Sequence, residues 1–316
     1  MKEIGGYFQL DQLVNNPYHK NMIELNTARN ALIYLVKAKK ITKVYLPYFL
    51  CNSIVNMLDR HSIQYEYYHI DKSFLPLFDK ELKPNEYLYV VNYYGQMSND
   101  IMVSLKQNNI NIIVDNTQSF FQKPVRGIDT IYSCRKYFGL PDGAYLYTDT
   151  ILDNELEDDR SSQRMVHILG RYEGQASDYY KAFKDNDDSF KNLPLKKMSK
   201  LTRNILGGID YDKIIKTRNL NYRYLHDRLG TNNVLDIKIP KGAFAYPYYV
   251  KNGIEVRKSL AKINIYIPTL WPNVLRDKNE TSIEYDFAAN ILPLPCDQRY
   301  TENDMNYMIT NIEKVK

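Results

Sequence analysis

Hydrophobic residues recur every three or four positions between residues 27 and 37, which is the spacing of one buried helix face. The residues on this face are Ala28, Ala31, Leu32, Leu35 and Val36. Asn26 or Thr27 precedes them, and either side chain can cap the first turn. The pattern therefore predicts an amphipathic helix that begins near residue 28.

Strand and helix patterns alternate through the next eighty residues. We expect strands at residues 43–46, 65–69, 87–92 and 111–115, and helices near residues 52–60 and 99–108. Residues 112–114 are apolar at three consecutive positions, as in a strand that is covered on both faces. Such alternation is typical of an α/β layer with a largely parallel sheet.

The pattern changes near residue 210. Asp210 opens a long amphipathic segment that stops at Gly230, which predicts a helix. The segments that follow are predicted to be a strand, a helix and a strand, at residues 243–250, 255–263 and 265–270.

This change predicts two domains. A large α/β domain would span residues 1–209, and a small α+β domain would span residues 210–316. In the second, Pro268 and Pro272 bracket a rigid loop that holds the only tryptophan, Trp271.

Composition excludes several classes of protein. The 316 residues are 44% hydrophobic and 25% charged, which supports a sizeable core and rules out a disordered chain. No apolar run approaches the roughly 20 residues that cross a bilayer, and the first residues lack a secretion signal. We therefore expect a cytoplasmic protein without membrane contact. The net charge of +5 is too small for a nucleic-acid footprint.

Cysteine and histidine usage gives no sign of a metal or a disulfide framework. The three cysteines are scattered, and none of the five histidines falls at a metal-ligand spacing, so we predict no metal site. Two charged runs, acidic at 153–160 and basic at 191–203, are typical of solvated faces.

Candidate chemistry is concentrated in residues 111–148. Asp115 ends a predicted buried strand, and Gln118 follows three residues later. A carboxylate there can cap a turn, or it can hold a proton on a buried heteroaromatic nitrogen. Pyridoxal phosphate needs such a partner, because a protonated ring nitrogen makes the ring an electron sink.

Lys136 is the candidate nucleophile. Its neighbours are mainly apolar and Arg135 is adjacent, and both features favour the deprotonated amine that attacks carbonyls. Ser133 can donate a hydrogen bond to a cofactor phosphate, and Arg135 can neutralise it. The alternative is an exposed lysine in a turn.

The start of the first predicted helix suits a phosphate. Free N–H groups and the positive end of the helix dipole lie there, Ala28 is small, and the Thr27 hydroxyl adds a donor. The alternative is an ordinary helix cap. A phosphate-binding helix start, a strand-end Asp115 and then Lys136 follow the chain order of fold-type I pyridoxal phosphate enzymes.

Over nearly its whole length the chain resembles the DegT/DnrJ/StrS family of pyridoxal phosphate-dependent sugar aminotransferases. Five segments carry the resemblance: Thr27-Ala28-Arg29, Leu46-Pro47-Tyr48-Phe49, Asp115-Asn116-Thr117-Gln118, the run from Lys136 to Ala144, and the run from Leu294 to Tyr300.

The resemblance implies the fold-type I architecture, with a mostly parallel, seven-stranded-type sheet in the large domain. It implies that Lys136 is the Schiff-base lysine, that Asp115 pairs with the pyridine nitrogen and that Gln118 lies near the ring oxygen. Phe49 would stack on the ring. The residues implied for the phosphate are Thr27, Ala28, Arg29, Ser133 and Arg135.

The resemblance also implies the partners. Glutamate would donate the amino group to a keto sugar, linked to a nucleotide, in the synthesis of surface polysaccharide or a related glycan. The protein would be a homodimer with active sites shared between subunits. Residues 160–208 would then lie near the partner subunit or the substrate entrance.

Some features depart from the family. Its segment between the aspartate and the lysine is usually longer, and its serine stands five residues before the lysine, not three. Its N-x-R-M asparagine, which reaches the neighbouring subunit's cofactor, is missing, since this chain has Leu195-Lys196-Lys197-Met198. Asn204 is the candidate replacement. Two alternatives stay open: a dehydratase on a keto sugar, or a non-catalytic cofactor-binding scaffold.

Overall fold

The structure is a computed structural model that describes residues 4–108, 111–277 and 280–316. Its large sheet has eight strands among these residues, in the order β1-β8-β7-β6-β5-β2-β3-β4. The strands are β1 (Ile23–Leu25), β2 (Lys43–Pro47), β3 (Gln64–Ile70), β4 (Pro76–Leu77), β5 (Glu86–Val91), β6 (Ile112–Asp115), β7 (Asp129–Ser133) and β8 (Ala144–Tyr147).

Six of these strands run in one direction, and only β4 and β8 oppose them. The predicted α/β class with a mostly parallel sheet is therefore confirmed. The sheet has one strand more than a seven-stranded type, because the two-residue β4 pairs antiparallel with the edge strand β3.

Three helices follow strands of this sheet: α1 (Ala28–Ala38), α2 (Asn52–Arg60) and α3 (Asn99–Asn108). The Thr27 hydroxyl accepts a hydrogen bond from the Asn30 N–H at 3.0 Å, which caps the start of α1. Every side chain from residue 30 to residue 36 is buried, so protein covers α1 beyond its first two residues, which are half-buried.

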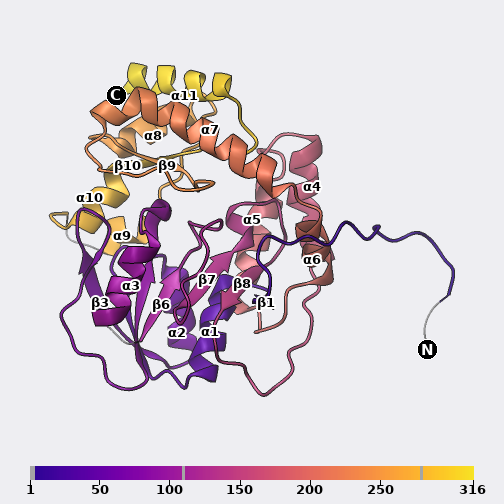
Figure 1. Ribbon diagram of the computed structural model, residues 1–316. Coiled ribbons are helices and arrows are strands. Elements are labelled where there is room, and N and C mark those ends of the chain that lie inside the picture. The colour runs from indigo at the N-terminus through magenta and orange to yellow at the C-terminus, as the bar shows by residue number, and fades with distance from the viewer. Residues whose placement is uncertain (1–3, 109–110, 278–279) are drawn as a thin grey trace.

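The C-terminal part has its own small sheet and core. In Figure 1 it lies at the top, above the large sheet. Strands β9 (Tyr246–Tyr249) and β10 (Ile291–Leu294) pair antiparallel. Helices α7 (Tyr211–Leu229), α8 (Gly253–Ala261) and α11 (Glu302–Val315) supply buried side chains to the same hydrophobic cluster. The division of the chain at residue 210 remains a prediction.

The prediction of a strand at residues 265–270 is wrong. This segment forms no strand, and β9 pairs instead with β10, which lies much later in the chain. Pro268 has no N–H to give to a ladder, and the segment leads into two short helices, α9 (Pro272–Asp277) and α10 (Ile283–Asn290).

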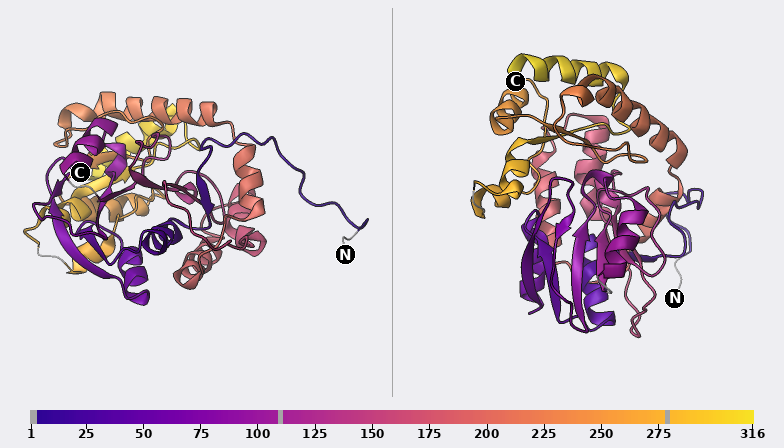
Figure 2. Two further views of the ribbon diagram at one scale, coloured as in Figure 1. Left: turned by 60° about the horizontal axis from the view of Figure 1, so that its bottom comes forward. Right: turned by 60° about the vertical axis from the view of Figure 1, so that its left-hand side comes forward.

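The middle of the chain forms three helices that the sequence pattern did not predict: α4 (Val166–Glu173), α5 (Tyr180–Ser189) and α6 (Lys200–Gly207). Short 3-10 turns occur at η1 (Tyr93–Gly95), η2 (Cys134–Lys136), η3 (Ser162–Met165), η4 (Phe190–Asn192) and η5 (Gly230–Asn232). Figure 1 and the left view of Figure 2 show residues 4–10 extending away from the body as an arm.

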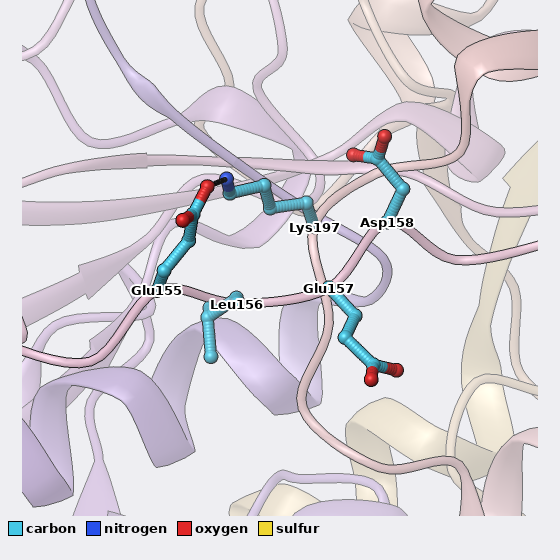
Figure 3. A pocket seen from close by; sticks show the side chains of 5 residues that line it. All are labelled: Glu155, Leu156, Glu157, Asp158 and Lys197. Carbon is cyan, nitrogen blue, oxygen red and sulfur yellow. Dashed lines mark hydrogen bonds and ion pairs between the residues drawn. The ribbon is translucent and has the colours of Figure 1, made fainter.

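The two charged runs lie side by side and form ion pairs with each other. Lys197 Nζ lies 3.1 Å from a Glu155 oxygen, and Lys196 Nζ lies 2.8 Å from a Glu157 oxygen. Figure 3 shows the first pair beside a shallow hollow of about 350 Å³, which contains none of the predicted site residues. The opposite charges of the two runs therefore offset each other at the surface.

No described helix is both long and apolar enough for a membrane span. Within the same part of the chain, no three His, Cys, Asp or Glu side chains gather in a way that could hold a metal ion.

Candidate active site

A cavity of about 720 Å³ opens at the carboxyl edge of the large sheet. Because β1, β2, β6 and β7 run in the same direction, the segments that follow them meet at this edge, which is where α/β proteins bind ligands. Eight of the nine predicted site residues line it: Thr27, Ala28, Arg29, Asp115, Gln118, Ser133, Arg135 and Lys136.

Asp115 is the last residue of β6, and its side chain is buried at the floor of the cavity. Its Oδ2 accepts a 2.7 Å hydrogen bond from the Tyr89 hydroxyl, and its Oδ1 accepts a 2.8 Å bond from the Thr117 N–H. Burial raises the pKa of Asp115, while both hydrogen bonds favour its charged form. This carboxylate can therefore pair with a cation bound in the cavity.

Lys136 ends η2, the turn that follows β7. Its side chain is reachable by solvent through the cavity, yet protein surrounds it, and this desolvation lowers the pKa of Lys136. The neighbouring Arg135 lowers that pKa further. Among the described residues, none forms a hydrogen bond or ion pair with its Nζ, so the amine is available to a ligand.

Two arginines give one end of the cavity a positive charge. Burial lowers the pKa of Arg135 to about 10 and also lowers that of Arg29, but both remain charged near neutral pH. The Arg135 guanidinium stacks on the Phe190 ring at 3.8 Å and lies 3.7 Å from a carboxylate oxygen of Asp187. Together with the start of α1, these groups can hold an anion.

The Gln118 amide is oriented by the backbone of η1. Its Oε1 accepts a 2.8 Å hydrogen bond from the Tyr94 N–H, where Tyr94 has a left-handed φ of 54°. No described residue accepts a hydrogen bond from its Nε2, so this amide group can donate to a bound molecule.

Phe49 does not line the cavity, which corrects its predicted position. Its side chain is 0% exposed, and its ring meets the Trp271 ring edge-on at 4.5 Å. Trp271 lines the cavity, so the proline-bracketed loop contributes aromatic surface there. A fully buried Phe49 supports Trp271 from behind and has no free face for a ligand.

Other lining residues were not predicted. They include Cys51, which caps α2, Phe244, which precedes β9, Tyr89 in β5, and Arg60 at the end of α2. The signal for Cys51 was present, because it directly precedes a predicted helix after a predicted strand. Tyr89 and Phe244 carry no local signal, since their place depends on pairing and packing between distant segments.

The side chain of Asn204, the candidate for the missing family asparagine, binds the N-terminal segment of its own chain. Its Oδ1 accepts a 2.8 Å hydrogen bond from the Leu13 N–H, and its Nδ2 donates to the Asp11 carbonyl at 2.8 Å. This side chain therefore fixes the N-terminal segment against α6.

The turn between Lys136 and β8 is held by a buried carboxylate. Asp142 is 0% exposed and accepts hydrogen bonds from the Ser199 N–H and hydroxyl, both at 2.8 Å, and from the Thr202 hydroxyl. The next residue, Gly143, has a φ of 116°, and a Cβ there would lie 2.9 Å from a Thr202 methyl. Only glycine fits this position beside the cavity.

The sequence matches no protein-family model and no curated protein. Solved structures match its fold. A DegT DnrJ EryC1 StrS aminotransferase from Brucella abortus is 14% identical, with a TM-score of 0.65 and coverage of 93% of this chain and 86% of that one. NtdA from Bacillus subtilis, with bound PMP, is 13% identical, with a TM-score of 0.65 and coverage of 96% and 78%.

A third match is the GDP-4-keto-6-deoxy-D-mannose-3-dehydratase of E. coli, with bound hydrated PLP. It is 14% identical, with a TM-score of 0.61 and coverage of 94% of this chain and 88% of that one. At such identities the likeness concerns the fold, and function is argued from the site. The chain has the fold of the DegT/DnrJ/EryC1/StrS aminotransferases.

Proposed function

We propose that the protein is a pyridoxal phosphate-dependent aminotransferase of the DegT/DnrJ/StrS family that acts on a keto sugar. One observation carries the proposal: an unpaired Lys136 amine with a lowered pKa and the buried Asp115 carboxylate line the same cavity. Their order along the chain is that of fold-type I enzymes, and solved structures with the same fold include several aminotransferases, among them a sugar aminotransferase from Micromonospora echinospora.

The donor set fits the cofactor. The Asp115 carboxylate would hold the proton on the ring nitrogen, and the free Nε2 of Gln118 would donate to the ring oxygen. Trp271 offers the exposed aromatic surface. The groups that would hold the phosphate are the Thr27 hydroxyl, the N–H groups at the start of α1, Ser133, Arg29 and Arg135.

When bound, the cofactor would supply an electron sink for the negative charge that develops beside the amino group. The chain supplies proton transfer and electrostatics. Lys136, with its lowered pKa, can take a proton from the carbon that bears the amino group and return it to the carbon on the other side of that nitrogen. Asp115 keeps the opposite end of the site negative, and Tyr89 holds that carboxylate in place.

We propose glutamate as the amino donor and a nucleotide-linked keto sugar as the acceptor, in surface polysaccharide or related glycan synthesis in the cytoplasm. The positive charge of Arg29, Arg60 and Lys191 along the cavity supports an anionic substrate. Titration with pyridoxal phosphate should give a yellow absorption band, and glutamate should convert it to the pyridoxamine form.

Lys136→Ala should abolish this conversion while leaving the fold intact by circular dichroism. Undiminished glutamate-dependent conversion in the variant would refute the proposal. A band that ignores glutamate and every other amino donor would favour the non-catalytic scaffold.

A second candidate function is dehydration of a keto sugar. The likeness to the E. coli dehydratase favours it, at nearly the same TM-score as the aminotransferases. Relatives that dehydrate tend to replace the lysine, and Lys136 is present. Release of a deoxy-keto sugar without net amino transfer, measured by mass spectrometry, would establish this reaction instead.

We also propose a homodimer with shared active sites. Val166, Leu169 and Tyr172 form an exposed stripe on α4, spaced three residues apart, and Tyr180 and Phe183 are exposed on α5. Apolar stripes of this kind support a protein partner. The arm adds exposed apolar side chains at Ile4, Tyr7, Phe8 and Leu10.

A further inference from the structure

An arginine without a carboxylate partner is buried beside the cavity. Arg218, in the middle of α7, is 2% exposed. Its Nε donates to Gln298 Oε1 at 2.7 Å, its Nη1 to the Ala243 carbonyl at 2.7 Å and its Nη2 to the Tyr137 carbonyl at 3.2 Å. Burying a cation costs several kcal/mol unless strong bonds compensate, so its position needs an explanation.

The nearest candidate for an ion pair is bound elsewhere. Both oxygens of Asp297 accept hydrogen bonds from the Arg299 side chain, at 2.7 and 2.8 Å. Within the described residues, no carboxylate lies at ion-pair distance from Arg218. The guanidinium is held only by neutral oxygens and by the Tyr137 ring, whose centroid is 4.5 Å away.

The first segment that Arg218 holds is the backbone one residue after Lys136, at the Tyr137 carbonyl. The Tyr137 carbonyl accepts bonds from Arg218 and from Gln298 Nε2, the latter at 2.8 Å. Gln298 in turn accepts the bond from Arg218 Nε, so the three groups form a closed triangle. This triangle ties the backbone that carries Lys136 to α7 and to the turn before α11.

The second segment is the loop that carries Phe244. Arg218 binds the carbonyl of Ala243, the residue before it. The adjacent Asn219 accepts a 2.8 Å bond from the Gly242 N–H through its Oδ1. Gly242 has a φ of 59°, and a Cβ there would lie 2.3 Å from the Phe121 ring, so this turn requires glycine.

We propose that Arg218 is a positioning residue that fixes the Lys136 backbone and the Phe244 wall relative to each other, so that the C-terminal part of the chain orients the reactive amine. The planar fork explains why an arginine stands here, because its donors reach three separate acceptors at once. The inference rests on the proposed function for Lys136, but its test does not require a bound cofactor.

The experiment measures how fast Lys136 itself reacts. Cofactor-free protein is treated with an amine-acylating reagent across a pH series, and modification of the Lys136 peptide is followed by mass spectrometry. The variants are Arg218→Met, which keeps the apolar stem, and Arg218→Lys, which keeps the charge. We expect Arg218→Met to change the Lys136 rate about tenfold and to displace its pH profile, as loss of charged hydrogen bonds should.

Asn221→Ala is the matched control. Asn221 is 4% exposed, lies one turn further along α7 and donates to the carbonyls of Cys296, Asp297 and Tyr300, none of which follows Lys136. The Asn221→Ala variant should have a lower melting temperature and a Lys136 rate within about twofold of wild type. Gln298→Ala should reproduce the effect of Arg218→Met in part, and Arg218→Lys should recover part of the rate.

Equal effects of Arg218→Met and Asn221→Ala on the Lys136 profile would overturn the inference, because Arg218 would then serve stability alone. If Arg218→Met fails to fold, Arg218→Lys and Gln298→Ala decide the question. A wild-type Lys136 rate and pH profile in these two variants would then overturn the inference. The proposed function fails separately: wild-type protein that binds no pyridoxal phosphate would refute the cofactor assignment, while the Lys136 profiles would still decide the role of Arg218.

Discussion

The Tyr89 hydroxyl donates a 2.7 Å hydrogen bond to Oδ2 of Asp115. Both side chains are buried, and Tyr89 reaches the carboxylate from β5, the strand next to β6. Burial raises the pKa of Asp115, and this bond opposes that effect. Tyr89 thus supports the charge that the proposed chemistry needs at the ring nitrogen.

Tyr89→Phe should slow the conversion of the cofactor by glutamate by about tenfold to a hundredfold, because a hydrogen bond to a charged group contributes about 1.5–3 kcal/mol. Without the bond, the pKa of Asp115 rises further, and its pairing with the ring nitrogen weakens. Stopped-flow absorption at saturating glutamate measures the rate.

Tyr132→Phe provides the control for this change. The Tyr132 hydroxyl is also largely enclosed, in the neighbouring β7, but donates at 2.9 Å to the Gln122 carbonyl and not to Asp115. The control should keep a rate within about twofold of wild type. Equal rates in the two variants would show that Tyr89 has no special role.

Elements with strong local signals could be predicted closely. The helices α2 and α3 have the predicted bounds, and the start of α1 follows from Thr27 as its cap. The helices α4 and α5 could not be predicted, because their exposed apolar side chains break the pattern of one buried face. The strand error at residues 265–270 arose because pairing of β9 with β10 depends on contacts distant in sequence.

The residues of the candidate site also divide into those with a local sequence signal and those placed by distant contacts. Asp115 was found because it ends a predicted strand, and Lys136 because of its apolar neighbours and the adjacent Arg135. Both line one cavity, since the ends of parallel strands meet at one edge of the sheet. Tyr89 was missed because it lies in the interior of β5, where only the register of Tyr89 with Ile113 places it beside Asp115. Trp271 lines the cavity in place of Phe49 because a loop from the C-terminal part packs there, over the Phe49 ring.

Arg135→Gln should move the pH dependence of Lys136 reactivity to higher pH. Desolvation lowers the pKa of Lys136, and the adjacent Arg135 cation lowers it further, so removing that cation raises the pKa. The rate of reaction with pyridoxal, which lacks the phosphate, should be measured from pH 6 to 10 so that loss of phosphate binding does not interfere.

Arg60→Gln is the control, since Arg60 lines the same cavity without contributing to the shift at Lys136. Its profile should coincide with that of the wild type. A profile of Arg135→Gln that moves to lower pH, or not at all, would contradict the electrostatic role assigned to Arg135.

His19 should make the protein sensitive to acid. Burial lowers the pKa of His19 to about 3, and its Nε2 lies 2.7 Å from the Phe120 carbonyl oxygen. The unfolded chain therefore binds a proton below pH 6.5, which the folded protein does not bind until about pH 3. From this residue, the free energy of unfolding should fall by about 1.4 kcal/mol per pH unit in that window.

Urea unfolding at pH 7.5, 6.0 and 5.0 measures this slope. His19→Asn should have the shallower slope, although it is less stable than wild type at pH 7.5 because a buried ring is lost. His61→Asn, at an exposed position where burial also lowers the pKa of His61, should reduce the slope less than His19→Asn does. Identical slopes in wild type and His19→Asn would show that His19 is not held neutral by the fold.

Leu169→Asp should convert the proposed dimer to a monomer. Leu169 is 56% exposed at the centre of the α4 stripe, between Val166 and Tyr172. An unpaired carboxylate buried in an interface costs about 2–5 kcal/mol, which raises the dissociation constant from about 30-fold to several thousandfold. Light scattering at micromolar concentration should give the mass of one chain for the variant and of two for the wild type.

Leu220→Asp tests whether any exposed leucine would do the same. Leu220 is 58% exposed, on α7, so it matches Leu169 in chemistry and exposure but not in location. It should leave the mass unchanged. If the sites are shared, Leu169→Asp should also lose glutamate-dependent conversion while remaining folded, because each cavity then lacks the partner's contribution. Full activity in a monomeric Leu169→Asp variant would show that one chain forms the whole site. A wild-type protein that is itself monomeric would refute the proposed dimer.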